Sequence, residues 1–218
     1  MRTSPGLLYA LGAFGMWGFF PLFFPLLEPA TPLEIVAHRV VWSLLFCAVL
    51  VTVSRSWGEL RTVLRSGRTL GLLALASVLL AANWLVFVFA VLAGHTVDAS
   101  LGYYINPLVT VALAVLVVGE RMRTGQWVAL AFGAGAVVVI SIGYGTVPWV
   151  ALALAATFGL YGLAKNRAGR TVGATTGLAV ETLVLVPAAL GYLVWLQASG
   201  AGTFGAHGGG HTALLASL

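Results

Sequence analysis

"LGLLALASVLLAANWLVFVFAVL" (residues 70–92) contains no charged side chain from one end to the other. An α-helix rises about 1.5 Å per residue, so a run of this length crosses a hydrocarbon core roughly 30 Å thick. We therefore interpret this stretch as a membrane-spanning helix. Similar apolar runs recur along the chain, and together they determine its fold class.

The composition of the whole chain supports this interpretation. Of its 218 residues, 60% are hydrophobic and 8% are charged, and the mean hydropathy is +1.02. Soluble domains carry about 25% charged residues, which keep their surfaces wet. We predict an all-α membrane protein, a polytopic helical bundle. The predicted spans are 6–26, 33–54, 70–92, 97–118, 126–143, 147–164 and 175–197, and an eighth span begins near Thr212.

Two connections between the predicted spans have distinctive compositions. Residues 55–69 mix apolar and arginine side chains, which favours a short segment at the lipid headgroups; a simple basic tether is the alternative. Residues 198–211 are rich in glycine, and we assign them no secondary structure. Without a helix, His207 and His211 do not share a face, and we predict no metal site there.

The lysines and arginines are distributed unevenly between the two sides of the predicted bundle. Ten of the eleven fall in alternate connections or before the first span, and the exception is Arg39. The positive-inside rule places that basic side, and the N-terminus with it, in the cytoplasm. The net charge of +5 is spread over short loops, so we predict no nucleic-acid partner.

Internal sequence similarity indicates a repeat. "FGMWGF" (14–19) in the first span resembles "FGLYGL" (158–163) in the sixth, and at nearly the same spacing His38 aligns with Glu181. An odd number of helices per repeat inverts the second copy, a recurrent plan of secondary transporters. We expect a ten-helix 5+5 plan of which about seven and a half helices are present. The first repeat would occupy 1–143, and the second, truncated within its third helix, 147–218.

Ionisable groups inside the predicted spans are the first candidates for function, because each costs about 2.5–3.5 kcal/mol near a helix centre. Arg39 lies six residues inside the second span, and Glu181 enters the seventh from the opposite face. Glu34 and His38 are four residues apart, which favours a pair near the outer boundary. The alternative is that His38 and Arg39 reach outward to the interface and only secure helix packing.

Uncharged polar groups and helix-breaking residues lie near mid-membrane. Asn106 precedes Pro107, which we expect to disturb the helix there and to free a backbone carbonyl. Interrupted helices at this depth are typical of transport sites, although each polar residue also fits plain packing. The predicted substrate-path residues are Trp17, Arg39, Asn83, Tyr103, Asn106, Tyr161 and Glu181, with His38 as a peripheral member.

Soluble-enzyme motifs are missing from the sequence. It contains no Walker loop, no H-E-x-x-H zinc motif and no G-x-S-x-G nucleophile elbow. The single cysteine, Cys47, lies in an apolar run and offers neither a disulfide nor a metal cluster. We predict that the chain is not an enzyme, requires no cofactor or metal, and does not itself hydrolyse ATP.

Several stretches, in their order and spacing, resemble the RarD-type EamA transporters of the drug/metabolite transporter superfamily. The resemblance runs from Gly6 to about Leu196 and is most specific over 97–123. The stretches are "AFGMWGFFPLFF", "EIVAHRVVWS", "NWLVFVFAV", "ASLGYYINPLVTVALAVLVVGERM" and "GLYGLAKNR" followed by "ETLVLVP".

The resemblance implies two inverted five-helix halves in a bacterial cell membrane, with both termini cytoplasmic. It implies that small metabolites or drugs are carried, often outward, by alternating access without ATP. We expect coupling to protons through His38 or Glu181, and partners limited to the lipid bilayer, an unidentified small molecule and, as an open alternative, a second copy of the chain. The alternative function is a non-transporting membrane scaffold or an inactive truncated fragment of such a carrier.

Overall fold

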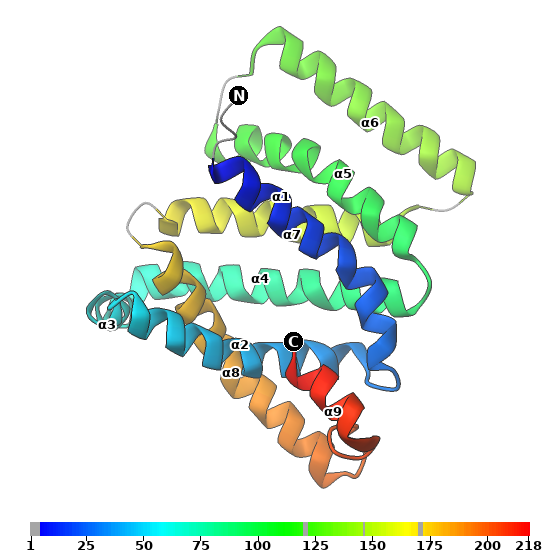
Figure 1. Ribbon diagram of the computed structural model, residues 1–218. Helices are drawn as coiled ribbons and strands as arrows, with labels where there is room; N and C mark the ends of the chain where they lie inside the picture. The colour runs from blue at the N-terminus through cyan, green and yellow to red at the C-terminus, as the bar shows by residue number, and fades with distance from the viewer. Residues whose placement is uncertain (1–4, 120–121, 146, 170–171) are drawn as a thin grey trace.

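The computed structural model describes residues 5–119, 122–145, 147–169 and 172–218, and every regular element in these ranges is a helix (Figure 1). Six of these helices are long and apolar enough to cross a membrane. Their bounds are Pro5–Phe23 (α1), Pro32–Val53 (α2), Gly67–Leu92 (α4), Thr96–Leu113 (α5), Thr124–Tyr144 (α6) and Ala174–Ala198 (α8). The predicted all-α polytopic class is confirmed.

A further long helix, Trp149–Gly169 (α7), lies between α4 and α5 in the bundle (Figure 1). It falls outside the six because its C-terminal turns carry Lys165, Asn166 and Arg167. The predicted sixth span ended at residue 164, so the helix continues further than expected. This extension brings Lys165 into the helix and onto the same face as Tyr161, four residues earlier.

The basic connections gather at one end of the bundle. In Figure 1 the end of α2, the start of α4 and the end of α7 all lie on the side of α3 (Trp57–Arg65), whereas the connections from α1 to α2 and from α4 to α5 lie opposite. This arrangement agrees with the alternation of charge along the chain. The cytoplasmic assignment of that side and the division into two repeats stay predictions.

The α3 helix differs in part from the expected surface segment. It is a helix with one apolar side, but its central apolar residues Leu60 and Val63 are 5% exposed and pack against α2, α4 and α8 rather than facing outward. Trp57 and Leu64 stay exposed. The segment is therefore attached to the bundle itself.

A single carboxylate joins α3 to the start of α8. Glu59 accepts hydrogen bonds from the Gly173 backbone N–H (2.7 Å) and the Thr176 hydroxyl (2.6 Å). Gly173 is the N-cap residue of α8 and has no capping side chain of its own. Glu59 thus caps this helix from a distant part of the chain, and these two donors hold its pKa below the usual value.

Replacing Glu59 with alanine is expected to loosen the first turn of α8. Loss of a capping acceptor costs about 0.5–1 kcal/mol at a solvent-exposed site, so the Gly173 amide should exchange with deuterium about two- to fivefold faster. Because the folded-state pKa is lowered, the stabilisation is present above the unfolded pKa and disappears as the pH falls through the folded one. Arg61→Ala, exposed on the same helix, is the control.

Hydrogen exchange at pH 7 and denaturant unfolding across an acid series together check this prediction. The stability difference between the native chain and Glu59→Ala should shrink toward acid pH. Equal exchange at the start of α8 in Glu59→Ala and Arg61→Ala would show that the cap does not act in solution.

Two local predictions are wrong. Residues 208–216 form a helix (α9, Gly208–Ala216), where a structureless connection was expected up to residue 211. The sequence does not reveal this helix because its stability comes from tertiary packing: Leu215 is fully buried against Phe24 and Leu27. His211 Nε2–H donates to the Leu27 carbonyl (3.0 Å), and the His211 ring centre lies 5.6 Å from that of His207.

The expected disturbance at Pro107 is also absent from its predicted place. The α5 helix runs from Thr96 to Leu113 through the proline. Pro107 is exposed on the helix surface, and it removes one backbone donor without ending the helix. The departure from α-helical geometry occurs later, in a π-helical segment (η2, Ala114–Val118).

A close helix contact joins α5 and α7. A Cβ atom at Gly102 would lie 2.9 Å from Leu154 Cβ and 3.0 Å from the Ala151 carbonyl oxygen. Ala99, Ala151 and Ala155 are fully buried along the same contact. Small residues permit this close approach of two membrane helices, and it fixes α7 as one wall of the site described next.

Candidate functional site

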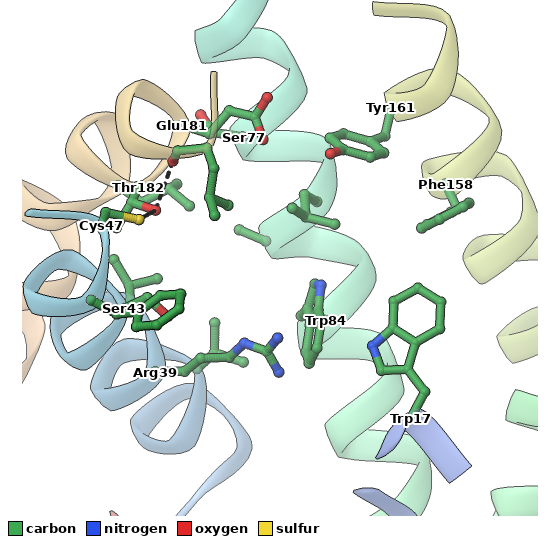
Figure 2. Close-up of a pocket in the computed structure, with 17 residues that line it drawn as sticks. Trp17, Arg39, Ser43, Cys47, Ser77, Trp84, Phe158, Tyr161, Glu181 and Thr182 are labelled. Carbon is green, nitrogen blue, oxygen red and sulfur yellow. Dashed lines mark hydrogen bonds between the residues drawn. The ribbon is translucent and has the colours of Figure 1, made fainter. Parts of the chain in front are cut away.

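A cavity of about 390 Å³ opens between α2, α4, α7 and α8 (Figure 2). Most of its wall is apolar, which is typical of small-molecule sites. Its ionisable and hydroxyl side chains sit at separate places on that wall. They are Arg39, Ser43 and Cys47 from α2, Ser77 from α4, Tyr161 from α7, and Glu181 and Thr182 from α8.

Arg39 occupies one end of this cavity. Its guanidinium carbon lies 2.9 Å from the centre of the Trp84 ring and 5.4 Å from that of Phe20. Figure 2 shows the side chain directed across the cavity toward Trp84. Arg39 is therefore held against aromatic rings inside the bundle, and the choice between a substrate-binding and a packing role stays a prediction.

Glu181 occupies the other end. Its Oε1 forms an ion pair with the Lys165 ammonium, and its Oε2 is buried without a hydrogen-bond partner among the described residues. The Glu181 side chain is 3% exposed, and the Lys165 side chain is 31% exposed. The Tyr161 hydroxyl points toward the same carboxylate (Figure 2). A buried acid is thus stabilised by a cation that still reaches water.

A second cavity, of about 760 Å³, lies between α1, α4 and α5. Tyr103 and Asn106 line it, together with the side of α1 that carries Phe14 and Pro21. Three aromatic residues, Trp17, Trp84 and Phe158, line both cavities. The two spaces therefore share an aromatic wall, which Figure 2 shows from the side of the first cavity.

The structure brings most of the predicted substrate-path residues to these cavities. Trp17, Arg39, Tyr161 and Glu181 line the first, and Trp17, Asn83, Tyr103 and Asn106 line the second. His38 lines neither of the two. Their role in binding a substrate stays a prediction, because the geometry shows only where they lie.

Asn83 and Asn106 also have structural partners. The Asn83 side-chain amide donates to the Leu154 carbonyl (3.0 Å) and to the Thr157 hydroxyl (2.9 Å), which ties α4 to α7. The Asn106 oxygen accepts a bond from the Thr110 hydroxyl on the next turn (3.3 Å). Packing therefore accounts for the Asn83 donors, and Asn83 is 2% exposed.

The predicted Glu34–His38 pair is wrong in the described structure. Glu34 Oε1 instead accepts bonds from the Thr203 N–H (2.8 Å) and hydroxyl (2.9 Å). The His38 ring stacks on Phe204, with 4.9 Å between ring centres. Both partners come from the 198–211 connection, which the sequence pattern left without structure.

Three residues at the first cavity were not predicted from the sequence: Trp84 and Phe158, which line it, and Lys165, which pairs with Glu181. Lys165 was counted as a loop charge, although its spacing of four residues from Tyr161 on a longer helix would have placed both on one face. Trp84 follows the candidate Asn83 directly, and Phe158 opens the repeated "FGLYGL" stretch. Cys47 was expected to be a small buried side chain, and it is 2% exposed with its sulfur 3.7 Å from the Thr182 hydroxyl.

The chain matches the model of the EamA-like transporter family over residues 4–142. Protein RarD of Streptomyces exfoliatus is 51% identical over 212 residues, which cover 97% of this chain and 67% of that protein. An uncharacterized transporter of Vibrio cholerae is 46% identical, covering 89% of this chain and 64% of its own length. Protein RarD of Escherichia coli is 40% identical, with coverages of 88% and 64%. The chain thus spans about two thirds of these curated relatives, and no solved structure matches it.

Proposed function

Because the chain belongs to the EamA-like transporter family and is a bacterial multi-pass membrane protein, we propose that it carries a small metabolite or drug across the cell membrane by alternating access. The driving force does not come from ATP hydrolysis by this chain. The proposed direction is outward, as the family resemblance implies, with the N-terminus in the cytoplasm.

One observation supports this proposal above the others: the first cavity lies among membrane-length helices and holds ionisable groups at both ends. Arg39 enters from the α2 side and Glu181 from the α8 side, with apolar wall between them. Ionisable groups at membrane depth mark substrate and ion pathways, because a merely structural position would be filled by an apolar side chain without this energetic cost.

The internal repeat gives independent support. Trp17 and Tyr161 occupy equivalent positions in "FGMWGF" and "FGLYGL", and both line the first cavity. A substrate site at the interface between inverted repeats is the usual arrangement in secondary transporters, where one half moves against the other around a fixed site.

Proton coupling is assigned to Glu181 within this proposal. Of the two residues considered, Glu181 lines a cavity, whereas His38 lies against Phe204 outside both spaces. Each of them holds one buried polar atom without a hydrogen-bond partner among the described residues, so their positions decide the assignment. The Lys165 ammonium would release Glu181 when the carboxylate takes up a proton, which links protonation to the packing of α7 against α8.

Flux measurements on the chain in proteoliposomes test the proposal. We expect substrate-dependent flux of at least one compound in a panel of small metabolites and drugs, without ATP inside or outside the vesicles. Glu181→Gln should flatten the dependence of that flux on pH, and Glu28→Gln, on the connection before α2, should not. No flux across the panel would favour the scaffold alternative, and an unchanged pH profile in Glu181→Gln would exclude the assigned coupling residue.

A further inference from the structure

Arg39 has no acidic partner among the described residues. The carboxylates that have partners there are bound elsewhere: Glu34 to Thr203, Glu59 to the start of α8, Asp98 to His95, and Glu181 to Lys165. No ion pair or hydrogen bond within the described ranges reaches the Arg39 guanidinium. A guanidinium at this depth normally requires an acceptor, because it is always charged and carries five N–H donors.

The aromatic contacts of Arg39 supply no oxygen acceptor for those donors. The N–H groups of a guanidinium project from the edge of its plane. The guanidinium carbon of Arg39 lies 2.9 Å from the centre of the Trp84 ring, and Arg39 lines the first cavity. Such an edge binds a carboxylate through two parallel hydrogen bonds, so Arg39 offers this cavity a group that recognises an anionic ligand.

The charge balance of the cavity also favours an anion. Glu181 is compensated by Lys165, so this end contributes no net charge. Arg39 is the remaining ionised group on the wall formed by the described lining residues, and it leaves the cavity with one excess positive charge. A ligand that carries one negative charge would neutralise it, whereas a cationic ligand would add to it.

The remaining wall determines the rest of the ligand. Beyond Arg39 lie Trp17, Trp84 and Phe158, followed by aliphatic side chains of α2, α4 and α8. Flat aromatic faces of this kind favour a planar or apolar body by stacking and burial. A cavity of about 390 Å³ admits a molecule of modest size.

We propose that this cavity binds a small amphipathic organic monoanion, whose carboxylate meets the edge of Arg39 while its apolar body lies against Trp17, Trp84 and Phe158. This inference rests on the proposed function, because it treats the cavity as the substrate site of a carrier. It specifies the chemical class of the substrate, which family membership alone does not define.

Binding to the full chain in lipid nanodiscs tests the inference without requiring transport. Radiolabelled phenylacetate is the probe, and its competitors are unlabelled phenylacetate, the uncharged phenylacetamide and the cationic phenethylamine at pH 7. We expect phenylacetate to compete about 10- to 100-fold better than phenylacetamide, the range expected for hydrogen bonds to a charged group. Phenethylamine should not compete. In Arg39→Gln this preference should disappear, and in Arg61→Gln it should persist.

The outcomes separate this inference from the proposed function. Equal competition by the anion and the amide in the native chain overturns the inference whether or not Arg39→Gln folds, and so does the absence of phenylacetate binding. A preference for the anion that survives in folded Arg39→Gln also overturns it. Selective binding with no flux of any compound would support the anion site and contradict the carrier. Flux of uncharged compounds without anion binding would support the carrier and contradict the anion site.

Discussion

Replacing Lys165 with methionine is expected to lower the free energy of unfolding by about 3 kcal/mol, because it leaves the Glu181 carboxylate buried without its cation. The value is at the lower end of the usual range for a broken buried pair, since 31% of the Lys165 side chain is exposed. Denaturant unfolding in detergent, followed by circular dichroism, measures it.

The two partners of this pair should not respond equally. Glu181→Gln leaves a lysine that can turn toward water, so we expect a loss of only about 1 kcal/mol. The double variant Lys165→Met/Glu181→Gln should recover most of the stability lost in Lys165→Met, since no bare charge remains buried. Arg167→Met, exposed one half-turn further on, is the matched control. A double variant no more stable than Lys165→Met would show that the pair is not coupled.

Replacing Gly102 with leucine is expected to destabilise the chain by about 3 kcal/mol, at the upper end for overpacking of a tight contact. The added side chain would meet the Ala151 backbone and Leu154 Cβ, neither of which can move without displacing α7. For a chain of this size the midpoint of thermal unfolding should fall by about 6–12 °C.

A second glycine supplies the control for this prediction. A Cβ atom at Gly135 in α6 meets nothing within 4 Å. Gly135→Leu should therefore leave the midpoint unchanged or raise it slightly, because leucine is the better helix former by roughly 0.5–1 kcal/mol. Equal midpoints for Gly102→Leu and Gly135→Leu would mean that α5 and α7 are not in the close contact described.

The fold class was predictable from local composition, and the detailed packing was not. A stretch such as 70–92 determines its own structure, because in lipid an uncharged run of that length satisfies its backbone N–H and C=O groups by forming a helix. The ends of helices are less predictable: Lys165 ended a predicted span by its charge, but the pair with Glu181 keeps it inside α7.

The candidate site, too, was predictable in part from the sequence and in part only from the packing. Arg39 and Glu181 were predictable because an ionisable residue in an apolar run is conspicuous wherever its neighbours lie. The contacts that orient them were not: Trp84, Phe158 and Lys165 acquire their roles only when α4, α7 and α8 come together. Thr203 donates to Glu34 Oε1 from a connection whose glycines indicate no structure, so no periodicity in the sequence could have paired them.

The bond between Glu34 and Thr203 also bears on how the chain is made. These residues are separated by 169 positions, and a ribosome adding about 5–20 residues per second needs roughly 8–34 s to synthesise the intervening chain. During that interval α2 has emerged with an acidic side chain whose eventual donors do not yet exist. The contact that holds Glu34 in the finished bundle can therefore form only after the α8–α9 connection has been synthesised, so this end of α2 reaches its final packing late.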